Sequence, residues 1–249
     1  PPAAPAAATV AIAIAIEEDP DATPPEDLSG QFSQAFADTF SVALEALTLG
    51  KIAYYVSTSL AFPDLKASSW SSRVKGVIAF AVEEAADLPV GSVAVALPPA
   101  PGRRRGLLQG GGLVVDVRVE SAGEVESRAI VGELRDAESS GALAGKMSEG
   151  GAPTRVEVVS PPVPAVDVEL RVHAPDAAAA SELVAQVEED AAPGGSGGLV
   201  GALVAAGVPS TAARQTSPSA VTVGQRVSGP VSDGGGAPAG GLSPSATMG

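Results

Sequence analysis

Leu88 to Ser121 reads LPVGSVAVALPPAPGRRRGLLQGGGLVVDVRVES, and the prediction of the fold starts from these residues. Gly91 to Leu97 and Leu113 to Glu120 are rich in valine and have the residue pattern of strands. The residues between them carry prolines at the front and three glycines at the back, which break a regular ladder. We therefore predict two strands joined by a long loop. A helical pattern precedes the first strand and another follows the second, so the stretch is the middle of a βαββαβ unit.

The flanking residues complete this unit and partly repeat it. A strand over Lys51 to Phe62 opens the unit and a strand over Thr154 to Ser160 closes it. A valine-rich strand over Ala165 to His173, a helix, a helical turn and a strand over Ala220 to Gly224 then form a second half-module. The predicted fold class is α+β, with two ferredoxin-like βαββαβ sandwich modules and extended Pro/Ala and Gly/Ser ends. The predicted parts are residues 1–50, which complete a module, 51–160, a complete module, 161–224, the half-module, and 225–249, a Gly/Ser/Pro-rich tail.

The first 50 residues supply a strand and a helix that the half-module lacks. After a Pro/Ala leader, Ala8 to Ile16 alternates alanine with larger residues, so both faces of this strand are apolar and it belongs inside a sheet. A helix is predicted from Asp27 or Ser29 to about Leu47, with its phenylalanines in the core. The strand inserts either into the sheet of its own chain or into that of a neighbour, where head-to-tail donation would build a filament. The residues of this candidate assembly strand are Val10, Ile12, Ile14 and Ile16.

Composition excludes several classes of partner and chemistry. The net charge of −14 disfavours nucleic acid and anionic membrane surfaces. No apolar run reaches the ~20 residues needed to span a bilayer, so no membrane span is predicted. The absence of cysteine removes disulfides and thiolate metal sites. The glycine runs lack the Lys-Ser/Thr of a phosphate-binding loop, and no cofactor is predicted.

No catalytic constellation is present, and we predict that the protein is not an enzyme. The single histidine, His173, ends a strand, and no G-x-S-x-G turn accompanies it. Glu17, Glu18, Asp19 and Asp21 offer oxygen ligands for calcium, but their spacing fits no EF-hand and a solvated acidic run is the favoured interpretation. No metal site is therefore predicted.

Arg103, Arg104 and Arg105 form the one basic cluster of an acidic chain. Three interpretations remain open for this loop: a solvated loop, a docking segment for an acidic patch such as Glu17 to Asp21, and a processing site. We expect the three arginines to be exposed, because adjacent like charges cannot be buried unpaired.

The run Arg103-Arg104-Arg105-Gly106-Leu107-Leu108-Gln109, after the Leu88-Pro89-Val90 turn, resembles repeated modules of green-algal secreted and cell-surface proteins. The resemblance is best over Val56 to Glu120. It implies an SEA-like, ferredoxin-like fold and a place in wall, matrix or flagellar-surface fibres. Gly91 to Val95 also resembles the self-cleavage site of SEA modules. In those modules the site follows the loop between the two middle strands, whereas here it opens the strand after the first helix, so an ordinary strand start is predicted.

The expected function is that of a structural subunit of an extracellular fibre or cell-wall or surface assembly. It would polymerise as a homo-oligomer or filament through module packing and strand donation, and carry O-linked glycans. The alternative is a cell-surface adhesion or glycan-binding module assisted by calcium.

Overall fold

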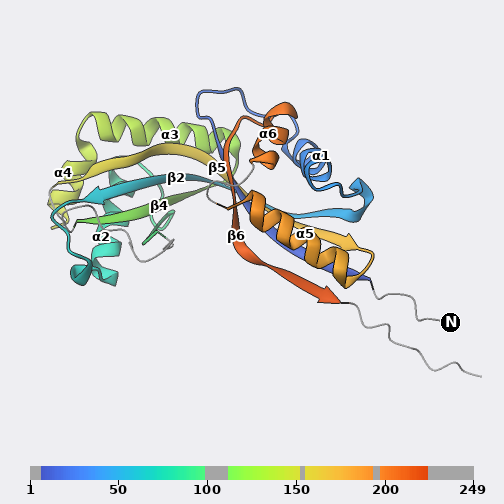
Figure 1. Ribbon diagram of the computed structural model, residues 1–249. Coiled ribbons are helices and arrows are strands. Elements are labelled where there is room, and N and C mark those ends of the chain that lie inside the picture. The colour runs from blue at the N-terminus through green and yellow to red at the C-terminus, as the bar shows by residue number, and fades with distance from the viewer. Residues whose placement is uncertain (1–6, 99–111, 152–154, 193–196, 224–249) are drawn as a thin grey trace, which may run out of the picture.

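The computed structural model describes residues 7–98, 112–151, 155–192 and 197–223. These residues build one antiparallel sheet of six strands in the order β3-β4-β2-β5-β1-β6, with helices packed against it (Figure 1). The predicted α+β class is confirmed, since helices pack against an antiparallel sheet. In chain order the elements are β1 (Ala8–Glu18), α1 (Leu28–Phe40), a 3-10 turn (Leu44–Ala46), β2 (Leu47–Phe62), a second 3-10 turn (Ala67–Ser69), α2 (Ser72–Ala85), β3 (Val93–Ala96), β4 (Leu113–Ser121), α3 (Glu124–Ser139), α4 (Ala142–Glu149), β5 (Glu157–Ala174), α5 (Ala177–Asp190), α6 (Gly198–Ala205) and β6 (Ser210–Val223).

The long strands β2 and β5 belong to two groups of strands at once. From Tyr54 onward β2 pairs with β4, whereas its earlier residues pair with β5 alone. The last ten residues of β5 pair with β1 on their other side. We call residues 54–164 the central half, and residues 8–53 together with 165–223 the terminal half. The strands lie in the order β3-β4-β2-β5 in the central half and β2-β5-β1-β6 in the terminal half.

β1 lies inside the sheet, between β5 and β6 of its own chain. The four predicted residues Val10, Ile12, Ile14 and Ile16 are at most 3% exposed and pack with α1, α5 and α6 in one core. Such burial follows from the alternation, because successive side chains point to opposite faces of a strand. The structure therefore has the strand within its own chain, and donation to a neighbour is not needed to fill this sheet.

The helix predicted to reach Leu47 is shorter, and the prediction is wrong at that end. α1 begins as expected after Asp27, whose carboxylate accepts a hydrogen bond from the Gly30 backbone N–H. It stops at Phe40 because Ser41 adopts a left-handed conformation, φ 54°, which closes the last turn. The three phenylalanines are buried, as predicted.

The predicted break between Thr154–Ser160 and Ala165–His173 is also wrong, because β5 runs unbroken through it and across the predicted part boundary at residue 160. Pro161, Pro162 and Pro164 suggested an interruption, since proline has no backbone donor for a ladder. The structure accommodates Pro161 and Pro162 at the register shift between Ser57 and Ser59 of β2, whereas Pro164 pairs opposite Val56 in regular register.

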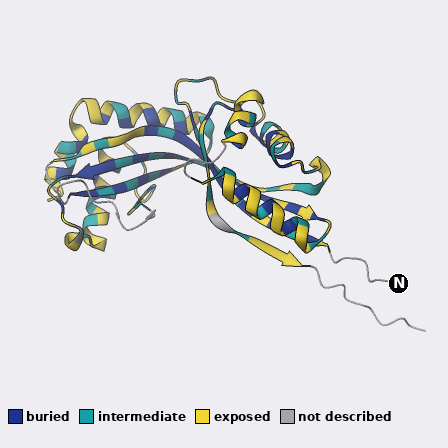
Figure 2. Ribbon diagram, in the orientation of Figure 1, coloured by how far each residue is buried: buried dark blue, intermediate teal, exposed yellow. Residues whose placement is uncertain are grey.

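One face of the sheet carries both hydrophobic cores, and no helix of the described residues packs on the other face. The terminal core lies under α1, α5 and α6, and the central core under α2, α3 and α4. Figure 2 shows buried and exposed residues alternating along the ribbons of the strands and helices. The helix-free face, called the open face below, is polar in β4 and β5, where it presents Asp116, Arg118, Glu120, Asp167, Glu169 and Arg171.

Candidate functional site

The junction of the two halves brings together most of the buried polar groups that the structure describes. On the helix side a network forms around Arg128, and on the open face a groove crosses from β4 to β6. The predicted docking loop, Arg103 to Arg105, lies outside the described residues, and its interpretations remain predictions.

The four acidic residues weighed as calcium ligands point to different partners. Glu17 pairs with Arg214 of β6, Glu18 with Arg128 of α3 and Asp21 with Arg135 of α3. Asp19 accepts a hydrogen bond from the Asp21 backbone N–H at 2.9 Å. Among the described residues, no group of three or more carboxylates and histidines converges as a metal site would require. The pairing also leaves less free negative charge for the arginine loop to dock on.

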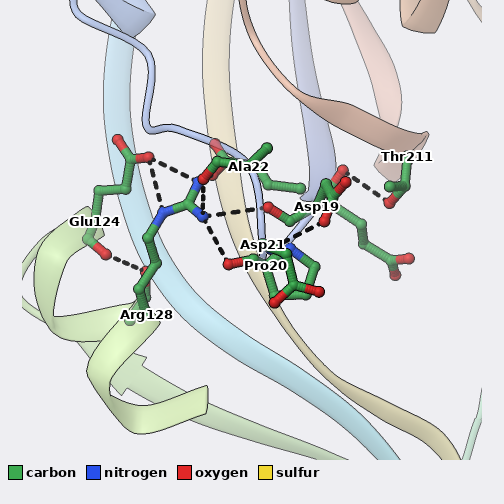
Figure 3. A network of polar contacts seen from close by, with 10 residues as sticks. Asp19, Pro20, Asp21, Ala22, Glu124, Arg128 and Thr211 are labelled. Carbon is green, nitrogen blue, oxygen red and sulfur yellow. Dashed lines mark hydrogen bonds and ion pairs between the residues drawn. The ribbon is translucent and has the colours of Figure 1, made fainter. Parts of the chain in front are cut away.

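Arg128 holds the loop that follows β1. Its side chain reaches from α3, in the central half, into the turn of that loop, in the terminal half (Figure 3). It is 15% exposed, and five acceptors lie within hydrogen-bond distance of its guanidinium, three of them at Nη1. The acceptors are the backbone oxygens of Asp19 (3.2 Å), Pro20 (3.1 Å) and Ala22 (2.8 Å) and the carboxylates of Glu18 (3.2 Å) and Glu124 (3.2 Å). We call this set the Arg128 network.

Glu18 is the most buried carboxylate in the network, at 1% exposure. Burial, and then the nearby Glu124 carboxylate, raise its pKa to about 7, against the lowering effect of Arg128. Its Oε1 has no hydrogen-bond partner among the described atoms, since Arg128 takes only Oε2. Burial, with Glu124 and Glu18, also raises the pKa of the neighbouring Tyr54 phenol. Protonation at Glu18 is thus sensitive to pH near neutrality.

In the sequence Glu18 is one of four neighbouring acids, and Arg128 does not stand out. One signal was available, because Glu124 and Arg128 are four residues apart on a predicted helix and can pair there. Glu18 stands 110 residues from Arg128, and no periodicity links the two.

On the open face, the junction forms a groove of about 610 Å³, called the junction groove. Five of the six strands contribute to it, so it is built from both halves. Hydroxyl groups dominate its lining, with a few charged side chains and small apolar ones. The lining residues are Ala15, Glu17, Tyr55, Ser57, Thr58, Ser59, Asp116, Ser160, Pro161, Val163, Arg214, Gln215 and Thr216.

Several of the groove's polar groups already have partners. Ser59 donates to Asp116 at 2.8 Å, and Thr58 donates to the Ser160 carbonyl at 2.7 Å. The Glu17 and Arg214 pair closes the end formed by β1 and β6. These contacts leave the groove with mixed donors and acceptors and a near balance of charge.

Tyr55 lies at the floor of the groove beneath Arg118. The Arg118 guanidinium is 3.5 Å from the ring centroid and donates to Asp167 at 2.7 Å. Tyr55 is 5% exposed, and burial together with the Asp167 carboxylate raises its phenol pKa well above the ordinary value. The ring is therefore covered and neutral, and it serves packing.

The other predicted features lie away from the junction. His173 lies near the end of β5, exposed, with Nδ1 3.2 Å from the Thr9 hydroxyl. Ser92 lies in the turn before β3, and Glu83 accepts hydrogen bonds from the backbone N–H groups of Gly91 and Val93 on either side of it. β3 covers Val93–Ala96, which is shorter than the strand predicted over Gly91 to Leu97.

None of the helices in the described part of the chain is both long and apolar enough to cross a membrane. In comparisons with known proteins, no family model, no curated protein and no solved structure matches the chain.

Proposed function

We propose that this protein is a non-enzymatic structural subunit of an extracellular fibre or of a cell-wall or surface assembly. The resemblance of the Val56 to Glu120 region to green-algal surface modules supports the extracellular setting, and the serines of the tail offer hydroxyl groups for O-linked glycans. The chain acts in this role as a homo-oligomer.

The fold proposed for this role is a pair of ferredoxin-like, SEA-like units fused in one sheet. Each half runs strand, helix, strand, strand, helix, strand, with one short extra helix, α4 or α6, before the last strand. In each half the strands lie in the order second, third, first, fourth. With antiparallel neighbours throughout, this is the split βαββαβ arrangement. Strand order, connectivity and the two separate cores are what support this assignment.

One observation carries the structural role: β2 and β5 run through both halves. At ~3.3 Å per residue, their 16 and 18 residues extend for roughly 50 to 60 Å. Two units joined by a flexible linker could turn against each other, but these two share a hydrogen-bonded ladder. The Arg128 network adds a second connection on the helix side. A stiff double unit of this kind suits a repeating subunit.

Negative-stain electron microscopy and light scattering of the purified native protein test the proposal. A subunit forms regular polymers that lengthen with protein concentration. A protein that stays monomeric at high concentration, in the presence and absence of calcium, contradicts the structural role.

The junction groove favours a second candidate, a glycan-binding module. Its volume lies in the range of small-ligand sites, and hydroxyl, amide and carboxylate groups such as Ser57, Gln215 and Asp116 can exchange hydrogen bonds with a neutral sugar. Titration calorimetry with neutral gluco- and galacto-oligosaccharides tests this candidate. Binding that Asp116→Ala weakens supports it, whereas no heat of binding with any of the sugars contradicts it.

A further inference from the structure

β6 closes one side of the sheet and leaves its outer edge open. In the described residues it pairs with β1 only, and it stands last in the strand order. β3, at the other side, is four residues long, whereas β6 has 14. A long edge strand presents unpaired backbone donors and acceptors, which other chains can use.

The two parts of β6 differ in how they are protected against pairing. Its first part has irregular register with β1, the charged Arg214, and Pro218, which lacks a backbone donor. These are the features that natural edges use to prevent association. The last part, Ser219 to Val223, reads SAVTV, with no charge and no proline. Its register with β1 is regular from Ala220 to Val223.

The same five residues carry an apolar strip that no helix covers. Val221 and Val223 are 40% and 47% exposed, although their ladder partners Val10 and Ala8 are 0% and 2% exposed. Directly paired residues lie on the same face, so both valines belong to the core side of the sheet. Figure 2 shows the end of β6 exposed, beyond the helices of the terminal half. The apolar side of the sheet thus extends to Val221 and Val223, beyond the part that the helices bury.

Residues 1–6 and 224–249, which flank the described part, have a composition poorly suited to pairing with this edge. Residues 224–249 contain eight glycines and three prolines, and residues 1–6 contain three prolines. Both residues are poorly suited to a strand, because glycine loses more conformational entropy on ordering and proline has no backbone N–H to donate. A second copy offers a better partner, because it brings the same β-branched, uncharged segment. In a chain of net charge −14, an uncharged edge is also where two copies meet with little repulsion.

We propose that two copies of the chain pair antiparallel through Ser219 to Val223 of β6, across a two-fold axis at Val221. Val221 then faces Val221 of the second copy, Val223 faces its Ser219, and one sheet runs through both molecules. The contact is isologous and closes on itself, so it gives a dimer rather than a filament. The inference rests on the proposed structural function, for which such a dimer is the building unit.

The contact is small, and its strength should be modest. A five-residue edge pair falls below the ~1,000 Å² expected of a stable interface. We therefore expect the dimer at high protein concentration, and within an assembly where many copies hold one another in place.

Cysteine cross-linking gives a direct test, because the chain contains no cysteine. Under mild oxidation Val221→Cys should form a covalent dimer readily, since side chains directly opposite in an antiparallel pair approach disulfide distance. The matched control is Val204→Cys on α6, where the valine is 53% exposed but off the edge. Equal cross-linking of the two variants would overturn the proposal.

Sedimentation velocity provides the second measurement. Val221→Lys should raise the dimer dissociation constant at least about tenfold, whereas Val204→Lys should leave it unchanged. A circular dichroism melt confirms that both variants fold. A wild-type chain that stays monomeric over the whole concentration range, or a Val221→Lys variant that dimerises normally, would refute the pairing.

The two proposals fail in different ways. Cross-linking at Val221 without polymers in the electron microscope would remove the structural function and leave the edge contact standing. Polymers that form equally well from the Val221→Lys variant would remove the edge contact and leave the structural function standing.

Discussion

Replacing Glu18 with Gln should change how stability depends on pH. The Glu18 carboxylate is buried, and its pKa in the folded protein is about 7, compared with 4.5 for an ordinary glutamate. The folded state therefore holds a proton on Glu18 in a pH range where the unfolded chain has released it. The stabilising effect of that proton is complete below about pH 4.5 and is lost as the pH rises through 7.

The size of the effect follows from the two pKa values. The two pKa values differ by about 2.5, and each pKa unit corresponds to about 1.4 kcal/mol. Roughly 3 kcal/mol of stability is therefore lost as the pH rises from about 4.5 to slightly above 7. Glutamine resembles the protonated acid and cannot ionise. We expect Glu18→Gln to match the wild type within about 1 kcal/mol at pH 4.5 and to be more stable by up to about 3 kcal/mol at pH 8.

Urea unfolding at a series of pH values, followed by the fluorescence of Trp70, measures this difference. Trp70 is the only tryptophan and packs against the central core, so its emission reports unfolding of that half. Asp21→Asn is the matched control, because Asp21 follows in the same loop and also pairs with an α3 arginine, but its side chain is 81% exposed. It should leave the pH dependence almost unchanged.

A second variant tests the cause of the raised pKa. The Glu124 carboxylate raises the pKa of Glu18, so Glu124→Gln should shift the loss of stability to lower pH. The reasoning is refuted if the stability difference between wild type and Glu18→Gln is the same at every pH.

Three further predictions concern other parts of the chain. Ile14→Ala should lower the free energy of unfolding by about 2 to 5 kcal/mol, because this 1% exposed side chain lies in the terminal core; a smaller loss in urea unfolding would argue against its burial. Ser41→Gly should raise the free energy of unfolding by up to ~1 kcal/mol, because Ser41 ends α1 at φ 54°; unchanged or lowered stability would contradict this. Replacing Arg103, Arg104 and Arg105 with Ser should leave the melting temperature unchanged and weaken self-association at low salt; identical association of both proteins at low and high salt would remove the docking role.

Much of the local structure follows from the sequence because it depends on neighbouring residues. The alternation from Val10 to Ile16 predicted a buried strand, since a period of two places these side chains on one face. Asp27 and Ser29 were the two predicted starts of α1, and Asp27 is the cap, because its carboxylate accepts a hydrogen bond from a free backbone N–H. The order of strands and helices also followed, which was enough to predict an α+β fold.

Tertiary structure alone decided how these elements join. Two separate strands were predicted before Ser160 and after Ala165, but pairing with β2 holds β5 as one strand, because the irregular register at Pro161 and Pro162 tolerates their missing donors. The partnership of Glu18 with Arg128 depends on two halves packing against each other, and 110 residues separate the pair. The junction groove likewise draws on five strands. Residues far apart in the chain meet only when the sheet forms, so no local pattern encodes these contacts.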